Sequence, residues 1–161
     1  MADSLEQMYN EKPGFFSKLI DPFSLEKLIG EEARQLHGIG EDVGGKGDAY
    51  RHLLASAILA KRHGPWYAEL IGNIHEWPVP GIGAGFNPHP QDTAMDLHNN
   101  ALGRQIANES KNYADVKRKT QSNIDSGTAK TIQEYKDRSV PIPDYNKDRT
   151  LKEWLDKYMS K

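Results

Sequence analysis

One stretch of the sequence constrains the fold more than any other, because its residues are apolar nearly all the way round a helix. It lies between Tyr50 and His63 and contains, in order, Leu53, Leu54, Ala55, Ala57, Ile58, Leu59 and Ala60. Gly47 or Asp48 marks its beginning, and Gly64 marks its end. A helix with this composition is buried on most sides. We therefore expect it to form the centre of the fold, with the other elements packed around it.

Helical spacing of apolar residues and end signals predict the remaining elements. One helix begins at Asp21, an N-cap before Pro22, and ends at the glycines that start with Gly38. Others cover residues 65–76, 93–113 and 128–136, and a last amphipathic helix starts at Thr150. Residues 77–92 hold four prolines and three glycines and form neither a helix nor a central strand. No alternating strand pattern occurs, so the sequence predicts an all-α fold, a compact bundle of about four to six helices.

The chain divides into three stretches that together make one domain. Residues 1–46 are expected to form a polar N-terminal arm with one helix, residues 47–113 a compact helical core, and residues 114–161 a polar tail. The apolar stripe of the last helix consists of Leu151, Trp154, Leu155 and Tyr158. A length of 161 residues suits a single domain, while 37% hydrophobic residues and a mean hydropathy of -0.76 indicate a modest core.

Composition argues against several classes of protein. Lys and Arg number 21 and Asp and Glu 23, and this net charge of -2 disfavours a nucleic-acid binder. The chain has no cysteine, which excludes disulfides, thiolate metal sites and cysteine nucleophiles. No run approaches the ~20 apolar residues of a membrane span, and residues 1–10, which lack a basic residue, do not form a secretory signal. We expect the protein to be made in the cytoplasm.

The predicted helix 93–113 carries a polar stripe between two apolar margins. At ~100° per residue, Asp96, Asn99, Asn100 and Gly103 fall on one face. Such a stripe indicates polar groups that face inward, and buried polar groups need partners. A glycine in mid-helix indicates close approach by another backbone or by a ligand. A hydrogen-bond network that only fixes helix packing is the structural alternative to a site.

Two further pairs of polar residues complete a candidate site. Asp48 and His52 lie four residues apart at the start of the apolar helix, and His75 and Glu76 end the next helix. A carboxylate is disfavoured at a helix C-terminus, so Glu76 is the best candidate for a general acid or base. A divalent cation, if one binds, would take carboxylate and imidazole ligands. Those ligands would be Asp48, His52, His75 and Asp96.

Three motifs occur in order within residues 46–107. They are Asp48-Ala49-Tyr50-Arg51-His52, then His75-Glu76, then Met95-Asp96-Leu97-His98-Asn99-Asn100 continuing to Gly103-Arg104. The chain thereby resembles a small bacterial and phage domain family of unassigned function. The resemblance implies a cell-envelope or phage context and an inward-facing polar constellation. Its members would be Asp48, Arg51, His52, His75, Glu76, Asp96, Asn99, Asn100 and Arg104.

The first functional hypothesis is an enzyme, a hydrolase of the bacterial cell envelope. Cleavage of peptidoglycan glycan would use Glu76 as general acid and Asp96 or Asp48 as the second carboxylate, with His52 in the same catalytic group. Metal-assisted hydrolysis of a phosphoester or amide would instead use Glu76 as base. The predicted substrate-binding residues are Arg51, His75, Asn99, Asn100 and Arg104, with His75 a cation ligand instead in the metal-assisted mechanism.

The second hypothesis is a non-catalytic virion or partner-binding module whose polar network is structural. The amphipathic helix expected from Thr150 favours docking to another protein. The partner would then be a virion or injection-machine protein, whereas the enzyme would meet the cell wall. Without a signal of its own, a chain of either kind would be delivered as a virion or injected component.

Overall fold

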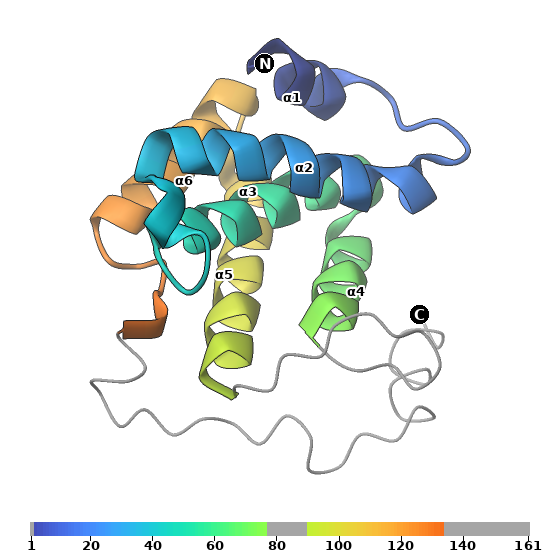
Figure 1. Cartoon of the computed structure of the whole chain (residues 1–161). Coiled ribbons are helices and arrows are strands. Elements are labelled where there is room, and N and C mark those ends of the chain that lie inside the picture. The colour runs from blue at the N-terminus through green and yellow to red at the C-terminus, as the bar shows by residue number, and fades with distance from the viewer. Residues whose placement is uncertain (1, 77–89, 134–161) are drawn as a thin grey trace, which may run out of the picture.

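The computed structural model describes residues 2–76 and 90–133, and this part of the chain contains helices and no strand. In chain order the elements are α1 (Ala2–Asn10), α2 (Ser17–His37), a 3-10 turn η1 (Ile39–Glu41), α3 (Lys46–His63), α4 (Pro65–Glu76), α5 (Pro90–Glu109) and α6 (Tyr113–Asp125). Figure 1 shows them packed into one bundle. The predicted all-α fold is confirmed. None of the described helices is long and apolar enough to cross a bilayer.

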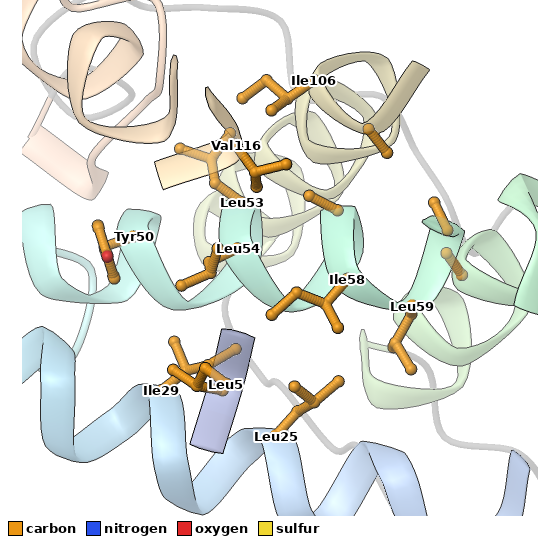
Figure 2. Close-up of a cluster of buried hydrophobic side chains, with 14 of the residues drawn as sticks. Leu5, Leu25, Ile29, Tyr50, Leu53, Leu54, Ile58, Leu59, Ile106 and Val116 are labelled. Atoms are coloured by element: carbon orange, nitrogen blue, oxygen red, sulfur yellow. The ribbon is translucent and has the colours of Figure 1, made fainter. Parts of the chain in front are cut away.

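The apolar helix α3 lies at the centre of the bundle. It packs against α2, α4, α5 and α6. Leu53, Leu54 and Ile58 are completely buried along it (Figure 2). Their partners across the core include Leu25 and Ile29 of α2. Burying this much apolar surface is the main stabilising contribution in a helical bundle, because each fully buried leucine or isoleucine contributes ~1.5–3 kcal/mol.

The hydrophobic core extends beyond residues 47–113. Leu5 of α1, Leu25 of α2 and Val116 of α6 are all buried in the same cluster as the α3 side chains. The stretches 1–46 and 114–161 therefore both supply core residues. Their polar composition conceals this contribution, because α2 and α6 present only narrow apolar faces to α3.

The prediction that a helix begins at Asp21 is wrong, since α2 begins four residues earlier, at Ser17. Asp21 lies inside the helix and is buried. Its Oδ2 accepts hydrogen bonds from Arg62 Nε at 2.6 Å and His63 Nε2 at 2.7 Å. Because the carboxylate of Asp21 is bound to these two distant residues, it does not cap the N-terminus of a helix. The local sequence does not show this long-range ion pair.

The predicted helix 93–113 corresponds to α5, which begins three residues earlier, at Pro90, so the prediction that residues 90–92 are not helical is wrong. Helix α5 ends at Glu109, and α6 begins after Asn112, whose side chain accepts a hydrogen bond from the backbone of Asp115. Helices α1 and α6 were not predicted. Of the helix expected from 128 to 136, residues 128–131 are not helical, residues 132 and 133 are helical, and the rest lies outside the described residues, as does the helix expected from Thr150.

Close contact between α3 and α5 depends on Gly103. A Cβ at this position would lie 2.4 Å from the carbonyl oxygen of Leu53 and 2.9 Å from Cβ of Ser56. The close backbone approach predicted from a mid-helix glycine is confirmed. One turn earlier, Ser56 Oγ donates a hydrogen bond of 2.7 Å to the carbonyl oxygen of Asn100. These contacts fix the register of α3 against α5, and this register determines which polar residues face one another.

Candidate functional site

Three helices bring the predicted site residues together. Helix α3 contributes Asp48 and His52 from its first turns, the last turn of α4 contributes Glu76, and the first half of α5 contributes Asp96. Asp48, Glu76 and Asp96 are all buried, and the His52 side chain lies between them with 12% exposed. Three buried carboxylates around one imidazole are a costly arrangement unless something compensates their charge.

The orientation of the His52 ring is set by Asn100. Nδ1 of His52 lies 3.2 Å from Oδ1 of Asn100, and an amide oxygen only accepts, so Nδ1 carries the hydrogen. The other ring nitrogen, Nε2, lies 3.2 Å from Asp96 Oδ1 and 3.6 Å from Asp48 Oδ1. Burial lowers the pKa of His52 and favours the neutral ring. The lone pair of Nε2 therefore faces two carboxylate oxygens.

Asp96 also contacts the carboxylate of Glu76. The two side chains hydrogen-bond to each other, and such a bond between two acids requires a shared proton. Burial, with the negative charges of Glu76 and Asp48, raises the pKa of Asp96 far above its ordinary value. Within the described part of the chain, Asp96 Oδ1 has no hydrogen-bond partner. The acid is therefore held in its protonated form unless a cation binds at this oxygen.

Asp48 is held in place from two directions. Its Oδ2 accepts a hydrogen bond of 2.7 Å from the backbone N–H of Gly44, just before α3. Its Oδ1, the atom nearest to His52, is also paired with Arg51. The guanidinium of Arg51 is in turn bonded to the carbonyl oxygen of Asp42 at 2.9 Å. The carboxylate is thus fixed in position while Oδ1 faces the cluster.

His75 and Arg51 are the more exposed members of the site. The His75 side chain is 62% exposed, and its Nδ1 donates a hydrogen bond of 2.7 Å to Oε1 of the buried Glu76. This bond raises the pKa of His75 above its ordinary value. Nε of Arg51 has no hydrogen-bond partner among the described residues. Two side chains with cationic character therefore lie beside a group of buried acids.

The spacing of these donors suits a divalent cation. Ligand atoms of Asp48, His52 and Asp96 all lie within 4.8 Å of one another, and so do those of His52, His75 and Glu76. Ligands ~2.0–2.2 Å from a zinc ion are separated from one another by roughly 3–3.5 Å, close to the distances from Nε2 to the two aspartates. A metal-bound histidine commonly donates its second N–H to a fixed acceptor, as His52 does to Asn100.

One of the predicted substrate-binding residues, Asn99, has other surroundings. The side-chain amide of Asn99 is engaged by Lys130, whose N–H and C=O bond to it at 2.9 Å each. This clamp attaches the segment after α6 to α5. Arg104 lies one helical turn beyond Asn100 and is partly buried. The cluster itself comprises Asp48, Arg51, His52, His75, Glu76, Asp96 and Asn100, and we refer to it as the acidic cluster.

Sequence reasoning missed two residues that support the acidic cluster. Ser56 binds the backbone of Asn100, and Gly72 of α4 lies so close that a Cβ there would be 2.9 Å from the Asn100 amide nitrogen. Ser56 had a detectable signal, because it is the one polar side chain within the apolar stretch 53–60. Gly72 had none, since a glycine in a helix does not reveal which neighbour approaches it.

Comparison with known proteins places the chain in a family. The family model described as "Domain of unknown function (DUF6973)" matches residues 18–135. The chain belongs to the DUF6973 family. The matched region of this DUF6973 protein contains every residue of the acidic cluster. No curated protein and no solved structure matches the chain.

Proposed function

We propose that this DUF6973 protein is a metal-assisted hydrolase of phosphoesters, with Asp48, His52 and Asp96 as the cation ligands. One observation carries the proposal: the unprotonated Nε2 of His52 faces two carboxylate oxygens, one of which has no hydrogen-bond partner within the described residues. Without a cation the cluster holds a proton, as the raised pKa of Asp96 shows, and a cation bound among these three groups would take the place of that proton. Carboxylate and imidazole ligands suit Zn²⁺ or Mn²⁺.

Glu76 and His75 have roles as proton acceptor and proton donor in this chemistry. A cation bound there would lower the pKa of a coordinated water towards ~7. Glu76, which hydrogen-bonds to the ligand Asp96, accepts the proton of the attacking water. The water oxygen forms the new bond to phosphorus as the ester oxygen leaves. His75, exposed beside Glu76, gives that oxygen its proton.

The substrate class follows from the charge at the exposed side of the cluster. The Arg51 side chain is 31% exposed, and the hydrogen bond to Glu76 favours the cationic form of the exposed His75. Cationic groups beside a metal site favour an anionic substrate, and guanidinium matches phosphate geometry. A neutral amide or glycan would make no use of this charge. Phosphoesters therefore match the charge of this site better than amides or glycans do.

Hydrolysis of a generic phosphodiester tests the proposal. Chelator-treated protein is assayed on bis(p-nitrophenyl) phosphate with and without added Mn²⁺ or Zn²⁺. We expect metal-dependent turnover that falls by ~10²–10⁴-fold in Glu76→Gln, while the bound metal is retained. A matched control is Glu109→Gln, at the end of α5 and outside the cluster, which should keep full activity. Metal-independent turnover, or full turnover in Glu76→Gln, would contradict the proposal.

Peptidoglycan cleavage with Glu76 as general acid is the second candidate, favoured by the envelope context that the sequence resemblance implies. Glycosidases separate their two carboxyl groups by at least ~5 Å, whereas Glu76 and Asp96 are within hydrogen-bonding distance. Asp48 would then have to be the second carboxylate. Release of soluble glycan from purified cell walls by chelator-treated protein, abolished in Glu76→Gln, would favour this candidate. If the folded protein hydrolyses neither the phosphodiester nor the cell wall, the result would favour the non-catalytic module.

A further inference from the structure

The beginning of α2 exposes a continuous row of large apolar side chains. Phe15, Phe16, Leu19, Ile20 and Phe23 are between 55% and 93% exposed. The last four recur at the spacing of one helix face. Phe15 and Phe16 lie edge to face with their ring centroids 5.0 Å apart. We refer to these five residues as the apolar stripe.

The opposite side of this helical segment is already used in the fold. Helix α2 packs on α3, and its Leu25 and Ile29 are buried in the hydrophobic core. At ~100° per residue, Leu25 falls opposite the centre of the apolar stripe. In Figure 1 this end of α2 lies at the edge of the bundle. The stripe is therefore a second apolar face of α2, and the described part of the chain leaves it exposed.

The start of α2 is anchored from below the apolar stripe. The carbonyl oxygen of Lys18 accepts a hydrogen bond from the hydroxyl of Tyr67 in α4, and the Lys18 ammonium lies 5.8 Å from the centre of the same ring. The carboxylate of the buried Asp21 is bound to Arg62 and His63. Both charged residues at the start of α2 therefore point away from the stripe. A surface that is preformed in this way loses little conformational entropy on binding.

The apolar stripe is large enough for one side of a protein interface. With ~150–250 Å² for each large aromatic side chain and somewhat less for leucine and isoleucine, the five residues expose roughly 700–800 Å² at the fractions above. A stable interface buries ~800 Å² on each partner. Homodimer interfaces are more apolar than interfaces between proteins that associate transiently, and interface cores are rich in aromatic residues and poor in charged ones. Area and composition both fit contact with a second copy of the chain.

The charges at the two ends of the apolar stripe are self-complementary. Glu11 and Lys12, just before the stripe, are exposed, and so are Glu26 and Lys27, one turn after Phe23. Each end thus offers one acid and one base. When two copies of a helix meet antiparallel around a two-fold axis, the first end of one copy faces the second end of the other, so acids can pair with bases at both ends. In a parallel pair each charge would instead meet its own counterpart.

We propose that this protein forms a two-fold symmetric dimer through the apolar stripe, in which the first turns of α2 from the two copies cross antiparallel. The aromatic and aliphatic side chains of the stripe pack against their counterparts in the second copy. The acid and base that follow Phe23 lie opposite the acid and base that precede Phe15 in the other copy. Removal of both stripes from water stabilises the dimer. The proposal is independent of the metal site, because the stripe contains no residue of the acidic cluster.

Sedimentation equilibrium of the full chain over a wide range of concentrations tests the proposal. We expect a monomer–dimer equilibrium with a Kd that is micromolar or tighter. The double variant Leu19→Glu/Phe23→Glu should weaken dimerisation at least ~100-fold, because it places charges at the centre of an apolar interface. Ile39→Glu/Val43→Glu is the matched control, since these side chains are 80% and 81% exposed but lie outside the stripe. The control should dimerise normally.

Two further variants test the antiparallel orientation. Glu26→Lys/Lys12→Glu gives the two ends of the stripe opposite charges, whereas Glu26→Lys/Glu11→Lys makes both ends positive. In an antiparallel dimer the first variant should associate at least ~10-fold more tightly than the second. In a parallel dimer, like charges would meet in both variants and their affinities would be equal, which would contradict the proposed orientation.

The outcomes separate self-association from the alternatives. Equal far-ultraviolet circular dichroism spectra of Leu19→Glu/Phe23→Glu and its control establish that folding is unchanged. A chain that stays monomeric at every concentration, or a dimer that Leu19→Glu/Phe23→Glu leaves intact, overturns the proposal. A monomer that binds phosphatidylglycerol vesicles, and loses this binding in the same variant, would assign the stripe to a lipid surface instead.

Discussion

The Nε2 atom of His52 lies 3.2 Å from Oδ1 of Asp96 and has no proton to share with it. The ring hydrogen is on Nδ1, where Asn100 accepts it, and burial disfavours a second one. An imidazole lone pair and a carboxylate oxygen at this distance repel unless a proton or a cation lies between them, and the raised pKa of Asp96 shows that a proton is held here when no cation is. This relationship is the central argument for a metal centre, and the neighbouring residues provide separate ways to test it.

Two adjacent asparagines should separate metal binding from stability. Asn100→Ala removes the acceptor that orients His52, and we expect metal affinity to fall by ~10–100-fold. Asn99→Ala removes the clamp on Lys130 instead. It should cost ~1–3 kcal/mol of unfolding free energy with metal affinity unchanged. Calorimetric titration and thermal unfolding of both variants measure the two effects. The same loss of affinity in both would contradict a specific role for Asn100.

The contact between α3 and α5 should be sensitive to a single methyl group. Gly103→Ala would place a Cβ 2.4 Å from the Leu53 carbonyl oxygen, so we expect it to lower stability by ~1–3 kcal/mol despite alanine's better helix propensity. Gly30→Ala in α2 is the matched control. Its nearest heavy atom would be 4.0 Å away, so stability should rise by ~0.5–1 kcal/mol. Denaturant unfolding compares the two, and equal effects would contradict this packing.

Patterns along the sequence predicted the helical fold and the residues that meet in the acidic cluster, but they also included Asn99, which binds Lys130 instead. The apolar stretch around Leu54 identified the central helix, and the polar stripe through Asp96 identified the face of α5 that turns inward. Both patterns repeat at the helical period, so they are visible without coordinates. The predicted start of a helix at Asp21 was wrong because its partners, Arg62 and His63, lie about forty residues further along the chain.

Two details of the site also depend on contacts between residues that are far apart in the sequence, so the sequence did not predict them. The proton position on His52 depends on Asn100, and the pairing of Asp96 with Glu76 depends on the crossing of α4 and α5. Neither follows from spacing along the chain. Asn99 and Asn100 are identical residue types at adjacent positions, and only the structure distinguishes the clamp on Lys130 from the support of His52.

The buried group formed by Asp21, Arg62 and His63 should dominate the stability of the N-terminal half. Asp21→Ala leaves two buried basic side chains without their acid, so we expect a loss of ~3–5 kcal/mol. Asp42→Ala breaks the more exposed pair with Arg34 and should cost less than ~1 kcal/mol. Chemical denaturation monitored by circular dichroism measures both. A small effect of Asp21→Ala would show that the ion pair does not hold α2 on α3.

Metal titration of the purified chain measures whether a cation binds at His52. Chelator-treated protein is titrated with Zn²⁺ and Mn²⁺ by calorimetry, alongside His52→Gln and the control His98→Gln. His98 bonds to the carbonyl oxygen of Thr128 outside the acidic cluster. We predict one cation per chain, affinity at least ~100-fold weaker in His52→Gln, and no change in His98→Gln. Absence of binding by the unmodified chain, or equal affinity in the two histidine variants, would contradict a metal centre at His52.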